Sequence, residues 1–262
     1  MIVIAHLSDF HIGDSHIGDS HDGSGERSIE RTRAVMDYLE DLPFDLDAVL
    51  VTGDIADHGR PAEYEQAREL LVSRHPVLVC PGNHDERAAF REGLLGQPGS
   101  AAPVNQVHRA SGFVVALCDS SVPGKDEGHL EDETLAWLDG VLDGTPDGVP
   151  VLVGFHHPPT LLHSPFIDGI RQFGEQRLAE LAGRRPGIVA FLCGHAHTPA
   201  ATTFAGRPLL VAPGVVSTLR LPWERHAHPE DHVHLDLPPA LAFHVLDDEG
   251  RLTTHYRWVG TC

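Results

Sequence analysis

The stretch IVIAHLSDFH, Ile2–His11, decides the fold, because an apolar run of strand length leads directly into two metal-ligand side chains. The run Ile2–Leu7 is nearly continuous in apolar residues, and Asp9 and His11 follow it. Such a run indicates a strand that is covered on both faces, as in an α/β sheet. Polar residues just past the carboxyl end of such a strand point to a ligand site.

Similar apolar runs recur along the chain and alternate with segments of helical period. The predicted strands are Ile2–Leu7, Ala48–Thr52, Pro76–Cys80, Phe113–Cys118, Val149–Phe155, Ile188–Cys193 and Pro208–Ala212. The predicted helices are Ile29–Leu42, Ala62–Ser73, Thr134–Leu142 and Gln172–Leu181. This alternation is typical of βαβ units and predicts an α/β fold.

The C-terminal part of the chain has a different pattern. Two alternating runs flank Asp248–Gly250 and predict a β-hairpin over 240–259. The preceding stretch 221–239 holds four prolines and four histidines and is predicted to be a loop or an arm. No linker interrupts the chain, so we expect one domain over residues 1–262.

Composition narrows the range of functions. The chain has 262 residues, 41% of them hydrophobic, and a formal net charge of −19. So acidic a protein repels nucleic acid, and no basic run or apolar run of membrane-spanning length is present in the sequence. The cysteines are scattered without a C-x-x-C pair, and the N-terminus does not resemble a signal peptide. We therefore expect a cytoplasmic protein that binds neither nucleic acid nor membrane.

Five predicted strands deliver Asp, Asn or His just past their carboxyl ends. These residues are Asp9 and His11; Asp54; Asn83, His84 and Asp85; His156 and His157; and His195 and His197. Any one of them alone is more often a turn residue, a helix cap or a hydrogen-bonded core histidine. Together they predict a metal site, because the carboxyl ends of parallel strands converge in space.

The ordered series DFH, GD, GNHD, HH and GHAH resembles the calcineurin-like metallophosphoesterases. In detail, GDIADHG, PGNHD, HHPP and GHAH resemble the class III cyclic nucleotide phosphodiesterases, a group that also contains glycerophosphodiesterases. The resemblance implies a four-layer α/β/β/α sandwich of two mixed sheets flanked by helices. It also implies a dinuclear metal centre at the ends of the strands.

The resemblance further assigns roles to individual residues. Asp9, His11 and His197 would hold the first metal, Asn83, His156 and His195 the second, and Asp54 would bridge both. His84 would stabilise the departing oxygen rather than bind metal. His157 is expected to lie outside the ligand set, and Asp57 or Asp85 to orient ligands or His84, or else to serve as turn or cap carboxylates.

The chemistry of the donor set indicates which cofactors to expect. Aspartate and histidine donors without thiolates suit two divalent or transition-metal ions, Mn, Fe or Zn. Two such ions about 3.5–4 Å apart can hold one hydroxide between them and clamp the phosphoryl oxygens. Attack of that hydroxide on phosphorus is the expected reaction.

A metal-dependent phosphodiesterase acting on 3′,5′-cyclic nucleotides is the leading hypothesis. The alternatives within the enzymes are a broad-specificity or glycerophosphodiester phosphodiesterase and a phosphomonoesterase. A metal-binding scaffold without turnover is the alternative from another class, and a nuclease is disfavoured by the charge. The expected partner is a small-molecule phosphodiester, and a homodimer formed through 221–239 is a candidate assembly.

The Asp-x-His pair of the opening stretch is repeated twice more, as Asp14–His16 and Asp19–His21. These copies lie in a segment rich in Gly, Ser, Asp and His, which does not fit a strand or a stable helix. We expect a loop at the mouth of the site, with His16 and His21 outside the metal ligands and either in contact with substrate or in solvent.

Overall fold

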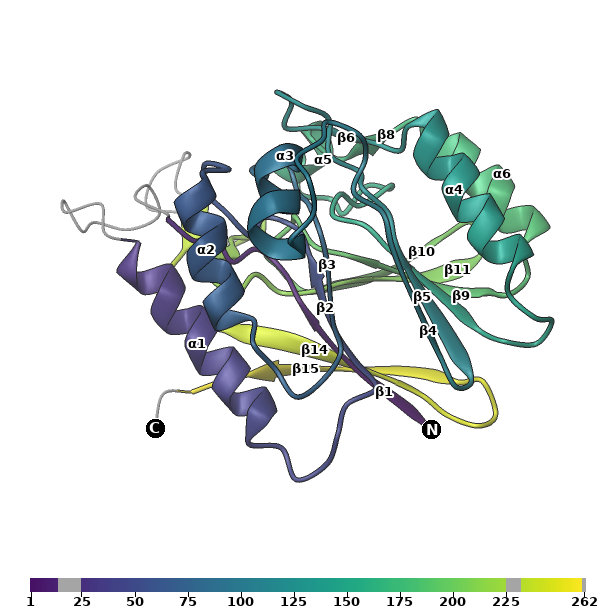
Figure 1. Ribbon diagram of the computed structural model, residues 1–262, viewed down its shortest axis with the longest axis horizontal. Coiled ribbons are helices and arrows are strands. Elements are labelled where there is room, and N and C mark those ends of the chain that lie inside the picture. The colour runs from purple at the N-terminus through teal and green to yellow at the C-terminus, as the bar shows by residue number, and fades with distance from the viewer. Residues whose placement is uncertain (14–24, 225–231, 261–262) are drawn as a thin grey trace.

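Two mixed β-sheets stack face to face at the centre of the molecule (Figure 1). The structure is a computed structural model and describes residues 1–13, 25–224 and 232–260. The five-stranded sheet has the order β15 (Leu252–Trp258), β14 (Ala240–Leu246), β1 (Ile2–Leu7), β2 (Ala48–Thr52), β3 (Val77–Cys80). The six-stranded sheet has the order β10 (Ala200–Phe204), β11 (Arg207–Val211), β9 (Ile188–Cys193), β7 (Val151–Gly154), β5 (Phe113–Leu117), β4 (Gln106–Ala110).

Helices cover the outer face of each sheet (Figure 1). The helices are α1 (Glu26–Glu40), α2 (Pro61–Leu70), α3 (Arg87–Phe90), α4 (Asp132–Asp143), α5 (Pro165–Gly169) and α6 (Glu175–Arg184), and a π-helical turn, Arg91–Leu95, follows α3. Two short parallel strands, β6 (Gly128–His129) and β8 (Gln172–Phe173), pair with each other, and so do the antiparallel β12 (Thr218–Leu219) and β13 (Val233–His234).

Three clusters of buried apolar side chains correspond to the three interfaces between four layers. One joins α1 and α2 to the five-stranded sheet, one joins α4 and α6 to the six-stranded sheet, and the third lies between the sheets. The predicted α/β/β/α sandwich is thereby confirmed. In β1 the side chains alternate: Ala5 and Leu7 face the helices, whereas Ile4 faces the other sheet. This explains the nearly continuous apolar run, because both faces of the strand are buried.

Some predicted elements have the bounds seen in the structure, and others do not. Strands β1, β2 and β9 have the predicted bounds. The helix predicted to start at Gln172 starts at Glu175, because Gln172 pairs in β8 and Gly174 has a left-handed φ of 73°. Strands β4 and β10 were not predicted, since these edge strands are largely exposed and lack an apolar run.

The C-terminal strands β14 and β15 form an antiparallel hairpin beside β1. Of the predicted loop or arm 221–239, residues 225–231 lie outside the described residues, and the remainder contributes β13. Within the described part of the chain, no helix has the length and apolar character needed to cross a membrane.

Candidate metal centre

The parallel pairing of the central strands brings the seven predicted ligands to one edge of the two sheets. Strands β1, β2 and β3 are parallel in one sheet, and β7 and β9 are parallel in the other. Each ligand follows one of these strands: Asp9 and His11 after β1, Asp54 after β2, Asn83 after β3, His156 after β7, and His195 and His197 after β9.

Two buried carboxylates lie between the histidines. The Asp54 Oδ2 atom is 3.2 Å from His156 Nε2 and 3.6 Å from His11 Nε2. The Asp9 Oδ1 atom is 3.4 Å from His197 Nε2 and 4.0 Å from His156 Nε2. Asp9, His11 and His197 offer ligand atoms within 4.8 Å of one another, and so do Asp9, Asp54 and His156. Asp54 therefore stands between the two predicted ligand groups.

Hydrogen bonds to the outer ring nitrogens orient three of the histidines. The Nδ1 atom of His11 donates to Asp57 Oδ1 at 2.9 Å, and that of His156 donates to the Thr52 carbonyl at 2.6 Å. The Nδ1 atom of His197 is hydrogen-bonded to Ser217 Oγ at 2.8 Å. Each bond fixes the ring and turns Nε2 toward the centre, which is how proteins hold metal-ligating histidines.

Three predicted ligands carry buried polar atoms that lack a hydrogen-bond partner among the described residues. They are Asp9 Oδ1, Asn83 Oδ1 and His195 Nε2. Buried polar atoms are rarely left unpaired, since each costs about 1–3 kcal/mol. Oxygen and imidazole nitrogen are the donors that Mn, Fe and Zn accept, so the residues present fit divalent metal ions.

The backbone at these residues is strained. Asp9, His11, Asp54, His195 and His197 have φ values of 58°, 49°, 50°, 67° and 53°. Left-handed φ is uncommon in residues other than glycine, and such strain gathers at functional sites. Gly194 and Gly82 serve close packing instead: a Cβ on Gly194 would lie 1.7 Å from Ser8 Oγ, and one on Gly82 would lie 2.1 Å from Asp54 Oδ1.

The carboxylates control the protonation of the histidines beside them. Burial alone would lower the pKa of His156, but the Asp54 and Asp9 carboxylates outweigh it and raise that pKa to about 9. Burial likewise opposes protonation of His11, yet its hydrogen bond to Asp57 and the charge of Asp54 raise its pKa to about 9. Because metal ligands must be deprotonated, a metal ion entering this centre would displace these protons.

His84 lies at the edge of the centre rather than inside it. Its backbone N–H donates to Asp54 Oδ1 at 3.0 Å, and its Nδ1 donates to the Asp57 carbonyl at 2.8 Å. The side chain is 40% exposed and lines the adjoining pocket. With Nδ1 engaged, Nε2 is the ring atom that can meet a ligand.

Asp85 joins two of the loops that carry ligands. Its carboxylate accepts hydrogen bonds from the backbone N–H groups of Ile55 at 3.1 Å, Ala56 at 3.0 Å and Gly82 at 2.9 Å. The hydroxyl of Tyr64 donates to it at 3.0 Å. Burial and the charge of Asp54 raise the pKa of Asp85 to about 6. Its geometry is that of an anchor between the GD and GNHD loops.

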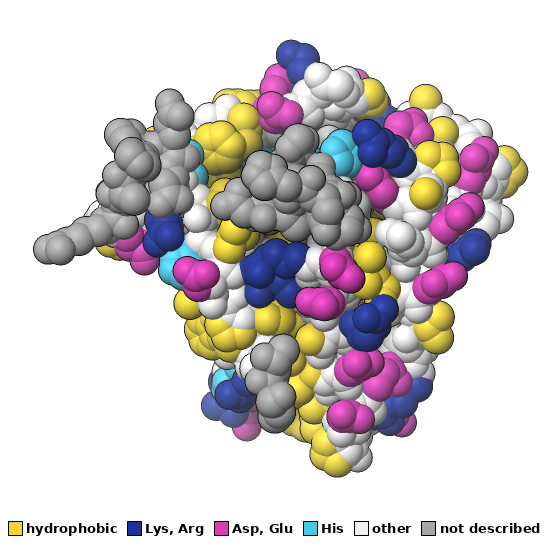
Figure 2. Space-filling view, turned by 90° about the vertical axis from the view of Figure 1, so that its left-hand side faces the viewer, with side chains coloured by type: hydrophobic (Ala, Val, Ile, Leu, Met, Phe, Trp, Pro, Cys, Tyr) yellow, Lys and Arg dark blue, Asp and Glu magenta, His cyan; other side chains and the backbone are white. Residues whose placement is uncertain are grey.

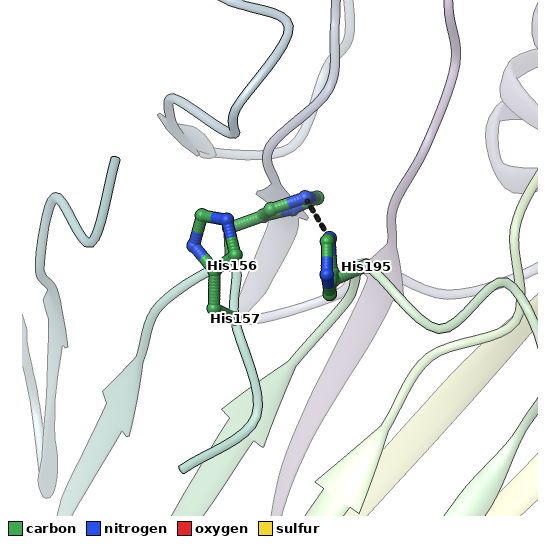
Figure 3. Close-up of side chains that lie close together, drawn as sticks. All are labelled: His156, His157 and His195. Carbon is green, nitrogen blue, oxygen red and sulfur yellow. Dashed lines mark hydrogen bonds between the residues drawn. The ribbon is translucent and has the colours of Figure 1, made fainter. Parts of the chain in front are cut away.

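His157 lies beside His156 and His195 (Figure 3). Its ring nitrogens, however, are hydrogen-bonded to other residues. Its Nε2 donates to the Asp126 carbonyl at 3.1 Å, and its Nδ1 accepts from Ser120 Oγ at 2.9 Å. The contact drawn in Figure 3 instead joins His195 Nδ1 to His156 Nε2 at 3.2 Å. His157 thus ties the Ser120 and Asp126 segment to the site.

A pocket of about 460 Å³ opens over the centre. Its floor includes six of the residues named above: His11, Asp54, Asn83, His84, His195 and His197. Apolar side chains of α5, β12 and β13 form one wall, and Asp57, His58 and Asp126 contribute polar groups. The pocket therefore joins a metal-ligand floor to an apolar wall.

A family model described as calcineurin-like phosphoesterase matches residues 2–199. The chain belongs to this family. A glycerophosphodiester phosphodiesterase GpdQ of Enterobacter lignolyticus is 36% identical over 76% of the chain and 71% of its own length. A 3′,5′-cyclic adenosine monophosphate phosphodiesterase CpdA of Escherichia coli is 30% identical over 72% of the chain and 68% of its own length.

Solved structures support the same fold. A dimetal phosphatase from Danio rerio superposes with a TM-score of 0.67 at 16% identity and covers 99% of each chain. Calcineurin-like phosphoesterases use two divalent metal ions, so the expected class, a metal-dependent hydrolase, is confirmed.

Asp57, named from the sequence as a residue that could orient ligands, is hydrogen-bonded to His11. Sequence reasoning missed two other groups that hold predicted ligands: Ser217 lies in no motif, and the carbonyl of Thr52 has no signal in the sequence. His16 and His21 lie outside the described residues.

Proposed function

We propose that this chain is a phosphodiesterase that hydrolyses 3′,5′-cyclic nucleotides at the centre described above. The observation that carries the proposal is the convergence of seven ligand-type side chains, three of them with unpaired buried atoms. The relative CpdA supports a cyclic nucleotide as substrate. The relative GpdQ supports a glycerophosphodiester, which is the second candidate substrate.

Asp9, His11 and His197 would hold the first metal, Asn83, His156 and His195 the second, and Asp54 both. When bound, two such ions would supply Lewis-acid activation of water and of the phosphoryl oxygens. Asp54 suits the shared position because its Oδ2 lies near one histidine of each group while a backbone N–H holds its Oδ1.

His84 would act on the leaving oxygen. Hydrolysis of a cyclic phosphodiester opens the ring, and the departing ribose oxygen needs a proton. The protonated His84 ring can donate one from Nε2, because Nδ1 is held by the Asp57 carbonyl. The exposure of the ring to the pocket lets it exchange that proton with solvent.

Substrate assays on protein loaded separately with Mn, Fe and Zn test this proposal. We expect turnover of cyclic AMP and of bis-p-nitrophenyl phosphate to exceed that of p-nitrophenyl phosphate, and Asp54→Ala to abolish all three activities. Turnover of glycerophosphodiesters alone would favour the second candidate substrate. Two bound metals without turnover of any ester would favour a scaffold.

The cellular location, the kind of substrate and the oligomeric state of the protein also belong to this proposal. Three buried free cysteines, Cys80, Cys118 and Cys193, support the cytoplasm as its location. A small-molecule phosphodiester substrate is supported by the relatives GpdQ and CpdA. On the face shown in Figure 2, acidic side chains of the described residues are interspersed with basic ones. A homodimer through 221–239 is proposed by analogy, and light scattering of the purified protein tests it.

A further inference from the structure

The apolar wall of the pocket is formed by two separate elements. Phe166, Ile167 and Ile170 come from α5 and the residue that follows it, and Leu219 and Val233 come from β12 and β13. A phosphoryl group is anionic and binds to charged and polar groups. It would therefore contact the predicted metal ligands at the floor of the pocket and not this apolar wall. The wall therefore suits a neutral, apolar part of the substrate.

The wall is fixed in place before any ligand binds. Ile167 is buried in the core beneath the six-stranded sheet, and Ile170 and Leu219 pack against that core. The Asp168 carboxylate accepts the backbone N–H of Leu162 at 2.7 Å and holds α5. The Thr198 hydroxyl donates to the Leu219 carbonyl at 2.6 Å, which ties β12 to the loop of His197. Because Ile167, Ile170 and Leu219 are already packed, this part of the wall binds a ligand at a smaller ordering cost.

Phe166 presents a large aromatic ring at this wall. Its side chain is 54% exposed although it lies beside the candidate metal centre. One neighbour is the ring of His232, with ring centroids 5.7 Å apart and planes inclined by 10°. An exposed aromatic ring in a pocket offers a flat surface on which another planar ring can stack.

We propose that Phe166, with Ile170 and Leu219, binds the base of a nucleotide whose phosphate lies over the metal ligands. The inference rests on the proposed function and adds to it a specificity determinant. Stacking on an aromatic side chain is tolerant of base identity, since every base has a π-face. A glycerol or ethanolamine group has no planar ring and would gain little from this wall.

The test compares two cyclic phosphodiesters that share a six-membered ring. Cyclic AMP carries ribose and adenine, whereas 1,3-cyclic propanediol phosphate carries neither. We expect Phe166→Ala to raise KM for cyclic AMP about tenfold or more, with little change in kcat. The same variant should leave kcat/KM for cyclic propanediol phosphate unchanged, and Phe166→Tyr should retain wild-type values for both substrates.

Leu161→Ala is the matched control, because Leu161 is an apolar side chain of the same segment, 52% exposed, that does not line the pocket. Binding of adenosine gives a readout that needs neither phosphate nor metal. Saturation-transfer NMR should show adenosine on the metal-free wild type and on Leu161→Ala, with a much weaker signal on Phe166→Ala.

Failure of the proposed function and failure of the inference about Phe166 give different results. If the wild type hydrolyses bis-p-nitrophenyl phosphate but no cyclic nucleotide, the proposed substrate is wrong. If the wild type hydrolyses cyclic AMP and Phe166→Ala keeps both its KM and its adenosine signal, the base lies elsewhere and the inference is overturned. Equal loss for both cyclic substrates would assign Phe166 to the shape of the site rather than to the base.

Discussion

A buried pair of histidines should make the protein sensitive to acid. His6 in β1 and His244 in β14 are at most 1% exposed, and His6 Nδ1 lies 3.0 Å from His244 Nε2. The outer nitrogens bond Thr52 Oγ1 and Thr254 Oγ1, both at 2.8 Å. The chain of hydrogen bonds satisfies both neutral rings, and a proton on either ring would place a charge in the core.

The size of the effect follows from the depressed pKa of His244. Burial lowers this pKa from 6.5 to about 3. When the pKa of a histidine is lower in the folded protein than in the unfolded chain, its full contribution to stability is present at pH values above the pKa of the unfolded chain. At lower pH the unfolded chain binds more protons than the folded protein, and this favours unfolding. That stability is lost as pH falls from 6.5 toward 3. The loss is about 1.4 kcal/mol per pH unit, or about 2 kcal/mol between pH 6.5 and pH 5.

Urea unfolding of wild type and His244→Gln at pH 7, 6 and 5 measures this contribution. The variant is expected to be less stable at pH 7, since it loses a packed and hydrogen-bonded ring, but its free energy of unfolding should fall less steeply with acid. Titrating groups that do not contact His244, including those of the metal centre, are common to both proteins and cancel in the difference. His255→Gln, which alters an exposed histidine of β15, should keep the wild-type slope. Equal slopes for wild type and His244→Gln would refute the reasoning.

The candidate centre yields four further predictions. His84→Ala should keep both metals and lower turnover by about 10²–10⁴-fold, with a smaller loss for p-nitrophenyl esters, whose leaving group needs less help; an equal loss for all leaving groups would argue for phosphate binding instead. His156→Ala should reduce metal content, measured by plasma mass spectrometry, from two ions toward one, and retention of both would show that the ligands are wrongly divided. Asp57→Asn should weaken the first metal by roughly 10–100-fold in a chelator competition, because Asp57 orients His11. His11→Ala should cost metal and nearly all activity, whereas His16→Ala should keep both metals; equal metal loss would show that His16 takes part in metal binding.

The sequence could predict that these side chains converge, because each predicted ligand follows a strand whose burial is visible as an apolar run. Strand β1 illustrates this, since its predicted bounds agree with the structure and place Asp9 and His11 at the edge of the sheet. The bounds alone could not show that β7 and β9 belong to the other sheet, because pairing between distant strands depends on packing. The stacking of the two sheets on each other is what brings His156, after β7, within 3.2 Å of Asp54, after β2.

Asp57 and Asp85 lie in motifs and could be predicted as supports of the ligands. The other supporting contacts could not be predicted, because they use groups that every residue has or residues that no motif contains. The carbonyl of Thr52 orients His156, and the hydroxyl of Ser217 orients His197. Ser217 reaches the site because Val216 N–H donates to the Asp9 carbonyl at 3.1 Å, a contact between segments about two hundred residues apart. The apolar wall could not be predicted either, because Phe166 and Leu219 come together in the pocket only through tertiary packing.

The left-handed backbone at the predicted ligands is held by hydrogen bonds between the loops that carry them. The N–H groups of Asp9 and His11 donate to the carbonyls of Gly53 and Asp54 at 3.1 and 2.9 Å. In return the N–H of His195 donates to Asp9 Oδ2 at 3.1 Å, so one loop from the second sheet is locked onto the first. Each bond offsets part of the cost of a left-handed φ, which is of order 1–3 kcal/mol per residue. Hydrogen bonds between loops of both sheets therefore hold the backbone at Asp9, His11 and His195, and this places the predicted ligands at one edge of the two sheets.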